Sequence, residues 1–250
     1  MEKTYDIAQA ARFIGVPAST LRYWEDEGLI HAQRDEGNGY RRYTLHDLME
    51  AGEVAFYREM GISVKTLAGY RSFSVEQFDD VLADARRGVE KRMRELEFVK
   101  GRVDRQLELN ARARRLAAGE SVDERPSFQR LDELDYDSAA QWDLLIAEPE
   151  RYGVYVSAEG AHELVEAVID PDDPAPCALL WPRSNDDAEL EWEECLLKCD
   201  FNGGRSNAAE LFAATRDEGR VPRCIVGRYL LTASEGERWD WYQAWVGCIR

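Results

Sequence analysis

Residues 7–30, IAQAARFIGVPASTLRYWEDEGLI, set the architecture of the N-terminal part of this chain. The first half repeats apolar residues at helical spacing and ends in Gly15. The second half has a proline suited to a first helical turn, at position 17, and ends in Gly28. Two short helices joined by a turn that contains a glycine form a helix-turn-helix pattern.

The second of these helices has two different faces on a helical wheel. Leu21 and Trp24 share one face, which we expect to pack on the first helix. The other face carries a hydroxyl, a guanidinium and a phenol, which are groups that suit contacts to phosphates and base edges. A surface ion pair between Arg22 and Asp26 is the alternative. The candidate DNA contacts of this helix are Ser19, Thr20, Arg22 and Tyr23.

A hairpin is predicted directly after this helix, within HAQRDEGNGYRRYT (31–44). Its EGNG centre is a turn signal, and glycines let a backbone approach a phosphate chain closely. Strand alternation sends Tyr40 and Arg42 to one face and Arg41 and Tyr43 to the other. The alternative is an exposed hairpin with solvated arginines, but a hairpin after a helix-turn-helix is typical of a winged helix. Its candidate DNA contacts are Asn38, Gly39, Tyr40, Arg41 and Arg42.

A long helix is predicted over residues 74–119, beginning with a capping-box pattern at 74–77. A helix of roughly 40 residues is about 60 Å long. Residues 1–73 are too few to cover it, so we expect it to form a homodimer. A solvated single helix and packing on the chain's own C-terminal domain are the alternatives. The predicted heptad seam is Phe78, Leu82, Ala85, Val89, Arg92, Leu96, Val99, Val103, Gln106 and Asn110.

The chain after a short linker (117–127) mixes helix and strand patterns, which predicts an α+β domain. The acidic excess also lies there: residues 120–250 hold 12 Lys and Arg against 29 Asp and Glu, whereas residues 1–73 hold 9 against 11. The net charge of −17 therefore does not exclude a DNA-binding surface near the N-terminus. We expect helices at 138–147, 160–169 and 206–218, and strands at 152–157, 177–182, 194–201 and 224–233.

The N-terminal segments together resemble the DNA-binding domain of the MerR family of transcriptional regulators. The resemblance covers roughly residues 5–72 and includes GNGYRRYT (37–44) and YREMGISVKTL (57–67). The family's usual run is Arg-Thr-Leu-Arg-Tyr-Tyr-Glu followed by Gly-Leu. Trp24 replaces its second tyrosine. Ser19 replaces its first arginine, and the loss of that arginine is expected to remove a DNA contact or to alter the sequence preference. The matching residues are Thr20, Leu21, Arg22, Tyr23, Glu25, Gly28 and Leu29.

This resemblance implies a fold and a mechanism. The fold is α+β: a winged helix-turn-helix (1–73), a dimerisation helix that pairs as an antiparallel coiled coil (74–119), and an α+β effector-binding domain (120–250). Tyr40 and Arg41 match the family's wing, and Lys65 becomes a phosphate candidate in a second wing. The homodimer is expected to bind double-stranded promoter DNA and to deform it when an effector binds, which realigns the promoter for RNA polymerase.

Metal and redox sensing are disfavoured by the positions of cysteine and histidine. Sensors in the family place cysteines near the start of the dimerisation helix, but position 74 is Ser and the first cysteine is Cys177. Cys195 and Cys199 would share a strand face with Leu197 and Phe201, which favours core packing. The three histidines are scattered, so we expect no metal site and no cofactor.

The aromatic residues of the second half suggest a small-molecule effector. Six of the seven tryptophans follow residue 130, and the alternative is a well-filled core. Aromatic faces attract organic cations and carboxylates assist, so a lipophilic or cationic molecule is favoured, as in multidrug binding. The tail 227–249 weakly resembles a gyrase-inhibitor-like effector-binding domain, which favours a strand at 241–249. The candidate ligand-binding residues are Trp142, Tyr152, Tyr155, Trp181, Trp192, Tyr229, Trp239, Trp241, Tyr242 and Trp245.

Other functional classes are less consistent with the sequence. No run approaches the roughly 18–20 apolar residues of a membrane span, and no secretory signal is recognisable, so we expect a cytoplasmic protein with reduced thiols. No Ser/His/Asp or Cys/His spacing supports catalysis, so we do not expect an enzyme. Two alternatives stay open: an enzyme acting on an aromatic or electrophilic molecule through the C-terminal domain, and a DNA-architectural or ligand-sequestering protein.

Overall fold

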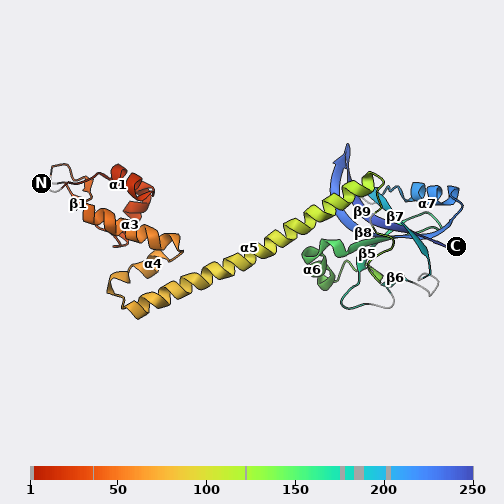
Figure 1. The fold of residues 1–250 in the computed structure, drawn as a ribbon, viewed down its shortest axis with the longest axis horizontal. Coiled ribbons are helices and arrows are strands. Elements are labelled where there is room, and N and C mark those ends of the chain that lie inside the picture. The colour runs from red at the N-terminus through yellow and green to blue at the C-terminus, as the bar shows by residue number, and fades with distance from the viewer. Residues whose placement is uncertain are drawn as a thin grey trace. The chain divides into compact units, whose positions relative to one another are not determined.

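The structure is a computed structural model that describes residues 3–35, 37–121, 123–174, 178–182, 189–200 and 204–249. It divides into two compact units, residues 1–100 and 101–250. Helix α5 (Val75–Ala117) is continuous and contributes residues to both units (Figure 1).

The first unit contains the predicted helix-turn-helix followed by a small hairpin. Asp6 and Gln9 form a capping box at the start of α1, and Gly15 ends this helix in the left-handed conformation, with φ of 78°. Leu21 and Trp24 of α2 are buried against the first helix, as expected. The elements are α1 (Ile7–Ile14), α2 (Ala18–Asp26), β1 (Gln33–Arg34), β2 (Arg41–Arg42), α3 (Leu45–Glu59), α4 (Val64–Leu67) and the 3-10 helix η1 (Tyr70–Ser72).

Helix α5 confirms the prediction of a long helix and begins with the expected cap. The Ser74 N–H donates to Gln77 Oε1 over 2.8 Å, and the Gln77 N–H donates to Ser74 Oγ over 3.3 Å. The first part of the predicted seam packs on the core of the first unit, through Phe78, Leu82 and Ala85. The middle of the helix carries an exposed apolar stripe, defined as Val89, Met93, Leu96, Val99, Val103 and Leu107, all of which are more than half exposed.

The second unit confirms the α+β prediction. Its described strands form one seven-stranded sheet in the order β6-β3-β5-β4-β8-β9-β7, and all the strand pairs are antiparallel. The elements after α5 are β3 (Leu131–Glu133), α6 (Ala139–Ala147), the 3-10 helix η2 (Pro149–Arg151), β4 (Tyr152–Ser157), β5 (Leu164–Ile169), β6 (Leu179–Trp181), β7 (Glu191–Asp200), α7 (Ala208–Asp217), β8 (Val221–Glu235) and β9 (Glu237–Ile249).

The two faces of this sheet are covered by different elements. Because side chains alternate along a strand, Tyr242 and Ala244 of β9 pack in the core that contains Phe212 of α7. Trp241, on the opposite face, packs against the last turns of α5, where Ala113 and Leu116 are buried. The C-terminal end of α5 is therefore part of the second unit and covers one face of its sheet.

One secondary-structure prediction for this unit is wrong. The segment 160–169 was expected to be a helix, but residues 164–169 form β5, paired with β3 and β4. Its flanks explain the difference: Gly160, His162 and Asp170 have φ values of 87°, 56° and 43°, which an α-helix does not accommodate. Strand β3 was not anticipated from the sequence.

The remaining expected elements are present, with the predicted ends for the strand at 152–157 and with different ends for the others. The strands expected at 152–157, 194–201 and 224–233 correspond to β4, β7 and β8, and the strand favoured at 241–249 lies within β9. The expected core position is confirmed for Leu197 and Cys199 of β7. Cys177 and Phe201 lie outside the described residues.

None of the helices within the described ranges combines the length and the apolarity that crossing a bilayer requires.

Candidate functional site

The exposed face of α2 carries three of its four candidate DNA contacts. Arg22 and Ser19 are exposed, Tyr23 keeps 49% of its surface, and Thr20 is half-buried. The structure records no ion pair between Arg22 and Asp26 among the residues that it describes. The guanidinium and the phenol are thus presented together at the surface of the first unit.

The hairpin presents Tyr40 at its tip. Tyr40 is 71% exposed, and its N–H donates to Asn38 Oδ1 over 2.9 Å. Gly39 has φ of 72°, a conformation that glycine adopts without strain. Tyr43, on the opposite strand face, is fully buried in the core of the first unit. The hairpin is therefore anchored by Tyr43 and exposes its glycine-rich tip.

The arginines of the hairpin are held by carboxylates. Arg41 Nε lies 2.5 Å from Glu25 Oε2, and Arg34 donates to the other oxygen of Glu25 over 3.3 Å. Arg42 donates to Asp35 over 3.3 Å. The hydrogen bond to Glu25 raises the pKa of Arg41, which therefore stays charged. Glu25 therefore joins the hairpin to α2. The sequence pattern includes Glu25 in the family's motif but does not predict that it holds the arginines of the hairpin.

Lys65 lies in the short helix α4, on the exposed surface of the first unit. Ser63 caps this helix by accepting a hydrogen bond from the Thr66 N–H over 3.0 Å. The ammonium group of Lys65 is thus placed on an ordered turn.

The ten aromatic candidates of the second unit do not converge on one site. The first group packs in a core: Trp245 is fully buried beside Phe128, and Tyr155, Trp181 and Trp192 belong to the same cluster. Trp239 and Trp241 form a second group, whose rings face the protein's own cations. Lys198 Nζ lies 4.3 Å from the Trp241 ring centroid, and the Arg205 guanidinium lies 5.4 Å from that of Trp239.

A third group, made of Trp142, Tyr152 and Tyr229, lines an open cavity of about 290 Å³, which we call the trough. Tyr242 is buried in the core and packs against two residues that line the trough, with its ring centroid 6.2 Å from that of Tyr152 and 5.8 Å from that of Tyr229. The trough is lined by Trp142, Leu145, Ile146, Pro149, Tyr152, Tyr229, Thr232 and Asp240.

Asp240 is the one carboxylate among the residues lining the trough. It accepts a hydrogen bond from Thr232 Oγ1 over 2.5 Å, and the Thr232 and Tyr229 hydroxyls are 2.7 Å apart. Burial, assisted by the charge of Asp240, raises the pKa of Tyr152 to about 12 and also raises that of Tyr229. The tyrosines therefore remain neutral hydroxyls, and the trough combines aromatic rings with one negative charge. No sequence pattern singles out this acid among the 29 Asp and Glu of residues 120–250.

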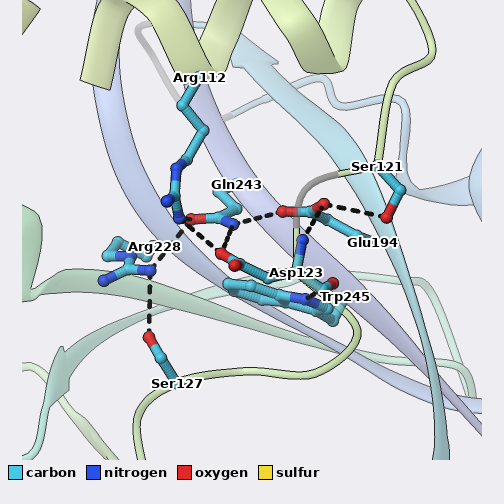
Figure 2. A network of polar contacts seen from close by, with 8 residues as sticks. All are labelled: Arg112, Ser121, Asp123, Ser127, Glu194, Arg228, Gln243 and Trp245. Carbon is cyan, nitrogen blue, oxygen red and sulfur yellow. Dashed lines mark hydrogen bonds and ion pairs between the residues drawn. The ribbon is translucent and has the colours of Figure 1, made fainter. Parts of the chain in front are cut away.

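A polar network lies on the opposite face of the sheet and is centred on Gln243 (Figure 2). The Gln243 side chain is fully buried, and its carbonyl oxygen accepts from Arg112 over 2.8 Å and from Arg228 over 3.0 Å. Its amide nitrogen donates to Asp123 over 2.9 Å and to Glu194. The primary amide thus uses both its donors and both acceptor positions, as a buried amide should.

The linker between α5 and the sheet belongs to the same network. The Asp123 carbonyl accepts from Trp245 Nε1 over 3.2 Å, and the Asp123 carboxylate pairs with Arg112 over 2.6 Å (Figure 2). Burial, reinforced by Arg112, lowers the pKa of Arg228. Beside the network lies a cavity of about 620 Å³, whose lining includes Glu120, Asp123, Glu124, Trp192, Glu193, Glu194 and Arg220.

Metal-ligating side chains do not gather in the part of the chain that the structure describes. Over those ranges, no group of three or more His, Cys, Asp or Glu residues is arranged to hold a metal ion. Burial raises the pKa of Cys199 to about 12, so its thiol stays protonated near neutral pH.

Comparisons with known proteins agree with the N-terminal geometry. The model of the "MerR family regulatory protein" matches residues 6–43. The HTH-type transcriptional activator TipA of Streptomyces coelicolor is 34% identical over 83 residues, which cover 33% of this chain and 30% of TipA. The HTH-type transcriptional regulator AdhR of Bacillus subtilis is 33% identical over 87 residues, covering 32% of this chain and 62% of AdhR. The chain thus spans less than two thirds of these curated relatives.

Among solved structures, the crystal structure of HiNmlR, "a MerR family regulator lacking the sensor domain, bound to promoter DNA", has 27% identity and a TM-score of 0.37. The aligned part covers 47% of this chain and 97% of the HiNmlR chain. The family match over residues 6–43 confirms the expected MerR-type helix-turn-helix in the N-terminal part of the chain.

Proposed function

We propose that this chain, with its MerR-type helix-turn-helix, is a homodimeric transcriptional regulator that binds double-stranded promoter DNA and responds to a small-molecule effector. The observation that carries the proposal is the exposed surface of Arg22 and Tyr23 on α2, a helix to which Glu25 joins the hairpin that exposes Tyr40. A recognition helix beside a wing is the arrangement that reads a groove while contacting phosphates. The relatives TipA and AdhR are named as a transcriptional activator and a transcriptional regulator, which supports the function of a regulator over that of an enzyme.

The exposed apolar stripe of α5 supports homodimerisation. Six large apolar side chains on a single helix are a surface that proteins cover with a partner. The charge distribution favours antiparallel pairing, because residues 75–84 hold four acids and no Lys or Arg, whereas residues 100–115 hold six Lys and Arg and two acids. Antiparallel helices place the acidic end of one against the basic part of the other.

The trough supports a lipophilic or cationic effector. Trp142, Tyr152 and Tyr229 supply aromatic surface, and Asp240 supplies the compensating charge. A cation stacked on aromatic rings beside a carboxylate is stabilised more than a neutral molecule of the same shape. The other aromatic candidates are packed in a core or face Lys198 and Arg205.

In the proposed mechanism, effector binding changes the DNA deformation that the dimer imposes on a promoter. Such deformation controls how well RNA polymerase can use promoter elements, without any covalent chemistry. This role places the protein in the cytoplasm, where promoter DNA is accessible.

The proposal is tested by fluorescence anisotropy with duplexes covering the DNA upstream of the gene, with and without tetraphenylphosphonium. We expect Arg22→Ala to weaken specific binding by about 10-fold or more and to reduce the salt slope by about one. Arg12→Ala, which removes an exposed arginine from α1, is the matched control and should change affinity less than about 3-fold. Equal effects of the two variants would contradict the assignment of α2 as the recognition helix.

A further inference from the structure

The trough lies on one face of β8 and β9. The surface on which the C-terminal part of α5 packs, which we call the seat of α5, lies on the opposite face of the same two strands. In β9, Asp240 lines the trough, whereas Trp241 packs against α5 and Gln243 is bonded to Arg112. In β8, Tyr229 lines the trough and Leu230 packs against α5. Neighbouring residues of each strand therefore contact the trough and α5 alternately, because side chains alternate between the two faces of a strand.

Strand β8 is irregular at this position. Its pairing with β9 changes register between Tyr229 and Leu231, which leaves Leu230 as an extra residue, as in a β-bulge. Leu230 is fully buried, and its carbonyl oxygen accepts a hydrogen bond from Gln106 Nε2 of α5 over 3.0 Å. A side chain of the long helix is thus bonded to the backbone of the residue that follows Tyr229.

A second polar contact joins α5 to β9. Arg112 donates to the buried carbonyl oxygen of Gln243, which also accepts from Arg228 of β8. The four hydrogen bonds of the Gln243 amide leave it little freedom, since a buried polar group that loses a partner is strongly destabilised. A shift of β9 at Asp240 therefore requires the Arg112 contact to adjust.

We propose that Gln106 and Arg112 are positioning residues through which filling of the trough changes the seat of α5 on the sheet. This inference rests on the proposed function, which makes the trough the effector site. A molecule that pushes on Tyr229 and Asp240 moves the backbone at Leu230 and Trp241, and the two polar contacts carry that movement to the helix. Because α5 is one continuous helix that also bears the apolar stripe, a change in its seat reaches the dimer surface.

The test needs neither DNA nor an effector, so its outcome is independent of whether the proposed function is correct. Thr232→Trp in the 250-residue chain fills the trough with a bulky ring, and hydrogen–deuterium exchange is followed at the amides of residues 109–117. We expect their exchange rates to change by about 10-fold, because local opening reports the stability of the helix seat. Ala209→Trp, on the exposed surface of α7, adds the same ring elsewhere and should leave these rates unchanged.

The role of Gln106 is tested in the same assay. In a Gln106→Met background, Thr232→Trp should change exchange at 109–117 by less than about 3-fold. Gln129→Met, at an exposed glutamine away from α5, should keep the full response. Thr232→Val, which removes the hydrogen bond to Asp240 at almost constant volume, replaces Thr232→Trp if that variant does not fold. The proposal is overturned if exchange changes in the strand peptides around Tyr229 and Asp240 but not at 109–117.

Discussion

Glu25 of α2 accepts a hydrogen bond from Arg41 of the hairpin over 2.5 Å, and its other carboxylate oxygen accepts one from Arg34. An acidic residue on the helix that we propose to face DNA is unfavourable for binding a polyanion. Its position here is explained by the two arginines that it orients, because one carboxylate that bridges Arg34 and Arg41 fixes the hairpin relative to α2. Glu25 thus sets the geometry of the wing at some cost in electrostatic attraction.

Glu25→Gln should release Arg34 and Arg41 while keeping the shape of the side chain. We expect binding to random duplex DNA to strengthen by about 3-fold and its salt slope to increase by about two, because two cations become available to phosphates. The preference for the specific site should fall by about 10-fold, because the wing loses its orientation. Asp26→Asn removes the same charge from an exposed acid of α2 and should leave the preference intact. Identical salt titrations for the two variants would refute the role of Glu25.

Leu96→Arg, in the middle of the exposed apolar stripe, should weaken homodimerisation. Placing a charge in a helix–helix seam leaves it desolvated, so we expect the dimer dissociation constant to rise by about 100-fold. Glu97→Arg introduces the same side chain at a neighbouring position outside the stripe and serves as the control. Sedimentation velocity over a concentration series measures both, and an unchanged dimer in Leu96→Arg would exclude this stripe as the interface.

Asp240→Asn should reduce the affinity for tetraphenylphosphonium by about 10-fold, because the only carboxylate among the residues lining the trough becomes neutral. The neutral analogue triphenylphosphine oxide should bind the variant and the parent protein within about 2-fold of each other. Glu237→Gln, an exposed acid on the same strand, is the matched control. Titrations followed by tryptophan fluorescence provide the measurement. A loss of equal size for the neutral analogue would show that Asp240 acts through structure and not through charge.

Tyr152 should contribute to alkaline unfolding of the second unit. Burial raises the pKa of Tyr152 from 10.0 to about 12, so the unfolded chain releases its proton at a lower pH than the folded chain does. Its contribution to stability is therefore complete below pH 10 and is lost as the pH rises from 10 to 12. Tyr152→Phe should flatten the pH dependence of the free energy of unfolding in that window, as measured by urea titration. Tyr136→Phe, at an exposed tyrosine, should preserve the slope of the parent protein.

Local sequence patterns were sufficient for the helical elements of the first unit. Gly15, Gly28 and Gly61 follow α1, α2 and α3 with positive φ, and the cap at Ser74 starts α5. These signals act over a few residues, where backbone geometry and capping are determined by neighbours in the chain. The same local rule failed at 160–169, because pairing with β3 and β4 outweighed an ambiguous apolar pattern.

The sequence by itself determined the helix-turn-helix, the hairpin turn, the long helix and the mixed nature of the second unit. Only the tertiary structure decided that Glu25 holds Arg41, sixteen positions away, and that Gln243 meets Arg112, 131 positions away. It also separated Trp245, fully buried, from Trp142 at the trough, although both are tryptophans in the same unit. The physical reason is that composition and periodicity fix which residues seek burial or a partner, whereas the chain path determines which of them can meet.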